Sequence, residues 1–259
     1  MTGFFRVALA FLRRDLLLVR PWAWVVGGLN SALLVLFWHF VTRFIKEVPD
    51  YFTFSVIGLA LSQYVWSGFA AFSNRVRMEQ TSGALESLWV TAYPFPRLVS
   101  LSGIWDFIAA TLNAGIILAI GTFGFGAHLR WDGMAYVMGV GFLTSLAMGS
   151  IGLVDASWVL VSGRGSSIRP LLNQAIPFFS GAFFPISLFP GWLKGIAWCL
   201  PLTHALTVTR GLLMGEGGTV VRQGWMALAG MTILLTVAGW GILALAVRQA
   251  RINGRLAAG

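Results

Sequence analysis

The side chains that most often carry chemistry are few and scattered in this sequence. The three histidines, His39, His128 and His204, fall in separate segments, which argues against a metal cluster or a catalytic dyad. Cys199 is the only cysteine, so the chain can form neither an internal disulfide nor a cysteine-rich metal site. We therefore expect no catalytic residue, no bound metal and no cofactor on this chain.

A nucleotide-hydrolysing site is not recognisable either. The pattern G-x-x-x-x-G-K-[ST] does not occur, and the run "GRGSS" from Gly163 to Ser167 is only a glycine-rich turn. Two carboxylates, Asp106 and Asp155, fall at or inside apolar runs, where charge is costly and often functional. A structural role is favoured for both. Asp106 begins its run near the surface, and Asp155 lies about two and a half turns before Arg164.

A short polar segment, "MEQTSGALESLWVTAYPFPRL" from Met78 to Leu98, separates two long apolar runs. Ser82 is a good helix cap, and Pro94 ends the helical pattern. One face of this helix carries an apolar stripe formed by Leu85, Leu88, Trp89 and Ala92. At about 16 Å the helix is too short to cross a membrane. The stripe could cover the base of its own bundle or enter a groove on a cytoplasmic partner. The pattern alone favours neither.

The composition places the chain in a membrane. Of its 259 residues 57% are hydrophobic and only 10% are charged, whereas soluble domains carry about 25% charged residues. The net charge of +9 is not a nucleic-acid signal, because the basic residues stand mostly at the ends of apolar runs. We expect an all-α integral membrane protein in contact with lipid, with no nucleic-acid partner.

Six apolar runs are long enough to span a bilayer core of about 30 Å. The expected spans are Trp22–Thr42, Phe52–Phe72, Gly103–Phe125, Ala135–Val161, Leu171–Phe189 and Trp225–Val247. The fourth contains Gly141, Ser145 and Gly149, whose spacing allows close helix packing within the subunit or between subunits.

The distribution of Lys and Arg predicts the orientation of these spans. With both termini in the cytoplasm, twelve basic residues lie inside and six outside. The outer six are Arg43, Lys46, Arg130, Lys194, Arg210 and Arg222. We therefore expect a multi-pass protein of the cytoplasmic (inner) membrane with both termini inside.

Three regions follow from this topology. Residues 1–21 are expected to form an amphipathic helix in the cytoplasmic interface, because Arg6, Arg13 and Arg20 recur along nearly one face. Residues 22–247 form the six-span domain, and residues 248–259 form a basic cytoplasmic tail.

The outer segment from about 190 to 215 is too apolar for an open loop. It has two apolar pieces of about ten residues, separated by Pro201, and each is too short to span. This pattern predicts a re-entrant hairpin that helps to close the outer end of a translocation route. The residues expected to matter there are Pro190, Trp192, Pro201, His204 and Arg210.

At two places the sequence resembles a known family. "EQTSGALESLWVTAYPFPRL" is similar to the E-x-x-x-G-T-L-E-x-L-x-x-T-P-x-x-R segment of ABC transporter permeases of the type-2 (ABC-2) family, which export polysaccharides and drugs. "SGAFFPISLFPGWLKGIAWCLPLTHALTVTRGLLMG", from Ser180 to Gly215, resembles the end of that family's fifth span and its outer hairpin. The departures are modest: Ala84 replaces a frequent Thr, and Ala92-Tyr93 separates Thr91 from Pro94.

The resemblance implies a function. Such permeases pair as dimers with two copies of a separate cytoplasmic ATPase, which binds the ATP and magnesium. The segment at about 79–93 would then be the coupling helix that receives the motion of the ATPase. Its expected contact residues are Glu79, Gly83, Leu85, Glu86, Leu88, Trp89 and Pro94.

The leading interpretation is thus the permease subunit of an ATP-driven exporter for an amphipathic or lipid-linked substrate such as a glycan or a drug. The resemblance implies a homodimer. The alternative is a secondary transporter or channel without an ATPase partner, although buried charge is sparse for an ion site. A lipid-modifying membrane enzyme is a third class, and it lacks clustered acids, bases or metal ligands.

Overall fold

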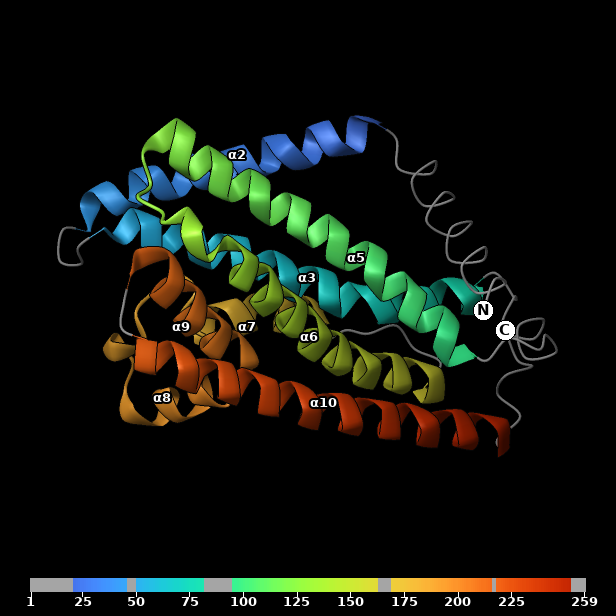
Figure 1. Cartoon of the computed structure of the whole chain (residues 1–259). Coiled ribbons are helices and arrows are strands. Elements are labelled where there is room, and N and C mark those ends of the chain that lie inside the picture. Colours follow the sequence, from blue (N-terminus) through green and yellow to red (C-terminus); the bar gives the residue numbers. More distant parts are fainter. Residues whose placement is uncertain (1–20, 46–49, 82–94, 163–168, 216–217, 253–259) are drawn as a thin grey trace.

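The described part of the chain is almost entirely helical. The computed structural model describes residues 21–45, 50–81, 95–162, 169–215 and 218–252, which form an elongated bundle (Figure 1). No strand occurs within these ranges. Helix α2 (Pro21–Phe44) begins, and helix α10 (Gly218–Ile252) ends, at the same end of the bundle. The all-α class expected from the sequence is confirmed.

Four described segments are long and apolar enough to cross a membrane. They are Val25–Phe44, Gly103–Gly124, Trp131–Val161 and Gly218–Gln249, and they coincide with the first, third, fourth and sixth expected spans. Large apolar side chains project outward from the bundle, including Leu29 of α2 at 62% exposure and Val237 of α10 at 70%. Apolar surface of this extent indicates contact with lipid or with another chain.

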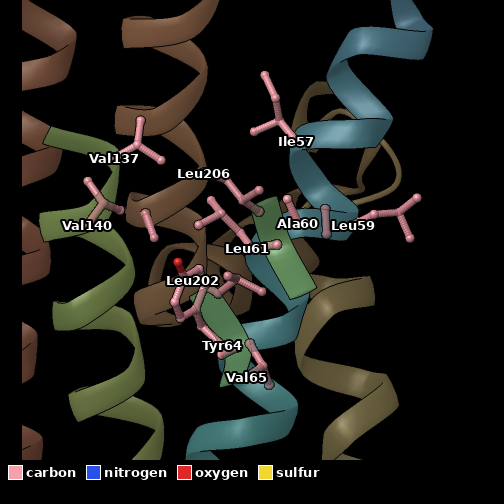
Figure 2. Packing of buried hydrophobic residues seen from close by; sticks show 14 of the residues in the cluster. Ile57, Leu59, Ala60, Leu61, Tyr64, Val65, Val137, Val140, Leu202 and Leu206 are labelled. Atoms are coloured by element: carbon pink, nitrogen blue, oxygen red, sulfur yellow. The ribbon is translucent and has the colours of Figure 1, made fainter. Parts of the chain in front are cut away.

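Helix α3 (Tyr51–Thr81) contains the second expected span and lies at the centre of the bundle, although it is not among those four segments. Its buried side chains form one cluster with those of α6 (Met134–Ser162) and α9 (Pro201–Met214), and Figure 2 shows Leu61, Tyr64, Val140 and Leu202 among its members. Residues 51–70 of this helix are mostly surrounded by protein, which accommodates polar side chains that lipid would not. The buried hydroxyls of Ser55 and Ser62 donate to carbonyls one turn earlier in the same helix.

The contact between α3 and α6 (Met134–Ser162) depends on glycine. A Cβ atom at Gly141 would lie 2.5 Å from Cζ of Tyr64, and one at Gly68 would lie 2.8 Å from Cβ of Met148. The backbones can therefore approach only where side chains are absent. The small-residue spacing in the fourth span serves packing within the subunit.

The third expected span is a longer α-helix than predicted, and it ends in a π-helical turn. Helix α5 begins at Phe95, before the expected Gly103, and runs to Ala119. It continues as a π-helix, η1 (Ile120–Gly124), and a short 3₁₀ turn, η2 (Trp131–Gly133), leads into α6. Single π-helical turns often occur at functional sites.

The fifth expected span, Leu171–Phe189, is helical over only part of its length. Helix α7 runs from Arg169 to Phe179, eleven residues or about 16 Å, less than the bilayer core. The chain then turns at Gly181, whose φ of +80° suits glycine, and continues to the 3₁₀ turn η3 (Ile186–Leu188). Residues 180–185, here the 180–185 turn, replace the second half of the expected span.

Two short helices complete the described fold. Helix α8 (Gly191–Trp198) and helix α9 (Pro201–Met214) follow the turn and lie where α3 begins and α10 begins. This end of the bundle is called the hairpin end below. Helix α9 is the more deeply buried of the two, with nine residues in the protein interior.

Candidate functional site

The predicted hairpin residues lie on α8 and α9 and have different environments. The carbonyl of Pro190 accepts the backbone N–H groups of Leu193 and Lys194 at 3.0 and 3.1 Å, which fixes the start of α8. Trp192 is 71% exposed. Its indole is therefore available to lipid or to a second chain rather than to the core of this subunit.

Pro201 separates the two helices, as the sequence predicts. It occupies the first position of α9, where the missing N–H costs nothing, and it is buried. The corner is closed by side chains of α9: Thr203 donates to the carbonyl of Ala197, and Nε2 of His204 lies 3.0 Å from the carbonyl oxygen of Trp198. The histidine thus has a local partner at the corner.

Arg210 extends from α9 into the protein and ties three segments together. Its Nη1 donates to the carbonyl of Gly181 at 3.0 Å, and its Nη2 donates to those of Ala182 at 2.9 Å and Phe54 at 3.2 Å. Its Cζ lies 3.3 Å from the centroid of the Phe54 ring. The guanidinium therefore connects α9, the start of α3 and the 180–185 turn.

The chemistry of this contact suits a guanidinium. Carbonyls that follow a helix C-terminus have no partner within the helix and carry partial negative charge, which a cation stabilises. Hydrogen bonds from a charged donor contribute about 1.5–3 kcal/mol, and a desolvated cation–π contact adds up to about 2 kcal/mol. Arg210 thus strongly stabilises the turn that follows the short helix α7.

Other helices hold the same turn. The hydroxyl of Tyr51 on α3 donates to the carbonyl of Phe183 at 2.6 Å. The ring of Phe183 in turn stacks on Trp38 of α2, with centroids 5.1 Å apart and an interplanar angle of 6°. A Cβ atom at Gly58 would lie 1.9 Å from the carbonyl oxygen of Ala182, so α3 and the turn touch backbone to backbone. The 180–185 turn is therefore the junction of α2, α3, α7 and α9.

Sequence reasoning named Arg210 but missed its partners. Tyr51, Phe54 and Trp38 stand in long apolar runs in which aromatic residues are frequent, and their spacing gives no sign of a shared site. The only signal was the run "SGAFFPI", whose glycine and proline indicate a turn inside an expected span.

An apolar cavity of about 280 Å³ lies between α3, α5, α6 and α10, toward the end opposite the hairpins. Phe107, Phe142 and Trp240 contribute its large side chains, and small residues such as Gly68 and Gly149 leave the space. A cavity of this lining suits hydrocarbon rather than a charged group.

The predicted coupling residues are not part of the described site. Glu79 lies near the end of α3, and only its backbone is described. Gly83, Leu85, Glu86, Leu88, Trp89 and Pro94 lie outside the described residues. Of the two carboxylates, Asp106 accepts the hydroxyl of Ser67 with its backbone carbonyl, and Oδ2 of Asp155 is buried without a hydrogen-bond donor among the described residues.

Residues 10–214 match the family model described as ABC-2 type transporter. The curated relatives include nodulation protein J of Rhizobium meliloti (strain 1021), 27% identical over 108 residues, which are 42% of this chain and 40% of the relative. Nodulation protein J of Rhizobium leguminosarum bv. trifolii is 30% identical with the same coverage. That of Neorhizobium galegae is 32% identical over 95 residues, 35% of this chain and 34% of the relative. The matched segments thus span well under half of each relative.

Proposed function

Because the chain belongs to the ABC-2 type transporter family, we propose that it is the membrane-spanning permease subunit of an ATP-driven exporter. The observation that carries the proposal is the extent of the family match. It covers 79% of the chain and includes both the 79–93 segment and the α8–α9 hairpin. In this proposal the ATPase is a separate cytoplasmic protein that binds the ATP and magnesium, and the permease forms a homodimer.

The proposed topology has six membrane segments with both termini in the cytoplasm. Four are the long apolar segments described above. The expected second span is α3, which is long enough to cross and whose described side chains pack largely against neighbouring helices. The expected fifth span corresponds to α7 together with the 180–185 turn and the residues up to Phe189, and the short α8 and α9 then form a hairpin within the outer leaflet. Residues 1–21 and 248–259 are the proposed interfacial helix and cytoplasmic tail.

The proposed substrate is amphipathic or lipid-linked, such as a glycan carrier lipid or a drug-like compound. The apolar cavity beside Phe107 and Trp240 supports this class, because it offers hydrocarbon-lined space within the membrane segments. The hairpin end would close the outer side of the route, with Arg210 holding the hairpin to the bundle. The 79–93 segment is the proposed coupling helix to the ATPase.

The deciding experiment is co-purification from the native membrane. Tagged full-length chain is expected to retain a protein with a P-loop and to show ATP hydrolysis in proteoliposomes. Replacement of the P-loop lysine of that ATPase is the matched control and should abolish hydrolysis without loss of the complex. If a functional, transport-active chain purifies without any such ATPase, the alternative of a secondary transporter or channel replaces the proposal.

A further inference from the structure

A second cavity lies at the hairpin end, beside the site already described. It has a volume of about 880 Å³ and is bounded by the start of α3, the segment between α5 and α6, Pro185 and the last turn of α9. This volume is within the range of about 300–1,000 Å³ that holds small ligands. Its lining differs from that of the apolar cavity, because it includes the ionisable residues Asp50, His128, Arg130 and Arg210.

The lining carries an excess of positive charge. Two arginines and one aspartate line the cavity, which gives a net charge of +1 when His128 is neutral. Of the two guanidinium groups only that of Arg130 is open to a ligand, because the terminal nitrogens of Arg210 donate to three carbonyls. Arg130 forms an ion pair with Asp132 at 3.8 Å, but the two side chains are 65% and 90% exposed. An exposed pair of that length contributes little. Arg130 can therefore exchange Asp132 for a ligand at small cost.

The main chain of Arg130 is held against α9. The backbone N–H of Arg130 donates to the carbonyl of Leu213 on α9 at 2.9 Å. Its side chain lies against Gly215, where a Cβ atom would come within 3.0 Å of Nη1. The guanidinium of Arg130 therefore lies in space that a side chain at position 215 would restrict.

Asp50, just before α3, is held by side-chain hydrogen bonds. The hydroxyl of Thr53 donates to Oδ1 of Asp50 at 2.7 Å and accepts the backbone N–H of His128 at 3.0 Å. This chain of bonds joins the start of α3 to the α5–α6 segment. The carboxylate of Asp50 is thus held in the cavity lining, where its negative charge disfavours anions.

A polar atom without a partner also lies in this lining. Thr122 belongs to the π-helix η1, and its Oγ1 is buried and forms no hydrogen bond within the described residues. Burying a hydroxyl without a partner is costly, but this oxygen is closed to solvent and gives no contact to a ligand in the open cavity. The π-helical turn is independent support, because such turns often mark functional sites.

We propose that this cavity binds a phosphate group, carried by a lipid headgroup or by a soluble phosphate ester. Guanidinium groups recognise phosphate through paired, charge-assisted hydrogen bonds, which Arg130 can supply from the cavity lining. This inference goes beyond the export function and depends on it only for the side of the membrane that the cavity faces.

The test is direct binding to the full-length chain in non-ionic detergent, without an ATPase, so that its failure is separable from failure of the export function. Glycerol phosphate is titrated by calorimetry, with glycerol as the phosphate-free control. Phosphatidylglycerol retention is measured by native mass spectrometry, with diacylglycerol as its control. Saturable binding of the lipid alone identifies a headgroup site, and binding of the soluble ester alone identifies a soluble ligand; both outcomes support the proposal.

Three variants test whether phosphate binding depends on the charged residues of this cavity. Arg130→Gln is expected to weaken binding about tenfold. Asp50→Asn keeps the acceptor for Thr53 and removes a repelling charge, so it should strengthen binding about threefold. Arg222→Gln removes the same charge from an exposed position of α10 outside the cavity and should change nothing. The proposal is overturned if neither phosphate probe binds above its control, if Arg130→Gln and Arg222→Gln weaken binding equally, or if Asp50→Asn weakens it.

Discussion

The guanidinium of Arg210 lies over the ring of Phe54, with 3.3 Å between Cζ and the ring centroid, while both of its terminal nitrogens donate to backbone carbonyls. Two of these carbonyls belong to the turn that follows the short helix α7, and the third belongs to Phe54 itself. A single side chain of α9 therefore fixes the place where α3 meets the turn. Any movement of the α8–α9 hairpin relative to α3 must break or carry this contact.

Loss of the Arg210 contacts should destabilise the protein. Arg210→Gln removes the charge and most of the donors, and we expect a loss of about 3 kcal/mol in the free energy of unfolding. Arg210→Lys should also lose stability, because an ammonium group cannot reproduce the planar fork toward three carbonyls. Thermal unfolding of detergent-purified protein measures both. Arg222→Gln on exposed α10 is the control, and an equal effect there would refute the role assigned to Arg210.

The close approach of α3 to the 180–185 turn gives a second stability prediction. Gly58→Ala places a Cβ atom 1.9 Å from the carbonyl oxygen of Ala182, so the backbones must separate, at a cost of about 2–3 kcal/mol. Gly115→Ala is the matched control, because a Cβ atom there meets nothing within 4 Å and alanine favours helix. The melting temperature should fall for the first variant and stay or rise for the second. A melting temperature unchanged by Gly58→Ala would contradict the described packing.

The length and hydropathy of the apolar runs were enough to predict most of the helices. The first, third, fourth and sixth expected spans appear as long apolar helices, because a lipid-facing helix must be apolar along its whole length. Helix α3 shows the limit of that rule, since its buried Ser55 and Ser62 donate to carbonyls of the same helix and protein surrounds this part of it. The break after Phe179 was not predicted, because Pro177 lies inside α7 without ending it and the turn occurs at Gly181 instead.

The candidate site was less accessible from sequence. Arg210 was singled out, but its bonds reach Gly181, 29 residues away, and Phe54, 156 residues away. Contacts of that separation depend on the tertiary arrangement and leave no periodic pattern in the sequence. The cavity beside Arg130 was missed for the same reason, since its charged residues come from three different segments.

The orientation of the bundle can be tested with single cysteines. In a Cys199→Ser background, which removes the exposed native thiol, cysteine at Thr2 or at Ala258 should be protected from an impermeant thiol reagent in intact cells. Cysteine at Asp132, whose side chain is 90% exposed at the hairpin end, should react. The expectation follows from the excess of basic residues on the terminal side. Labelling of either terminus from outside would contradict the predicted six-span topology. Permeabilised cells provide the positive control.

The proposed coupling segment makes the last prediction. If the helix at 79–93 only covers the base of the bundle, its apolar stripe faces the permease and substitutions there act through folding. If it docks on the ATPase, some of Leu85, Leu88 and Trp89 enter the partner, and Glu86 offers a charge to it. Removing an aromatic anchor commonly costs about 2 kcal/mol, which weakens docking roughly 25-fold.

Trp89→Ala and Glu86→Ala should therefore leave a folded, monodisperse permease but impair ATPase association or substrate-stimulated hydrolysis. The measurements are the amount of ATPase co-purified and the stimulated turnover in proteoliposomes. Trp192→Ala is the matched control, since it truncates a tryptophan that is 71% exposed at the opposite, hairpin end and should leave ATPase association intact. Normal association and turnover in both single variants would remove these residues from coupling. Normal behaviour of a Leu88→Ala, Trp89→Ala double variant would remove the helix, because the centre of its apolar stripe would then be dispensable.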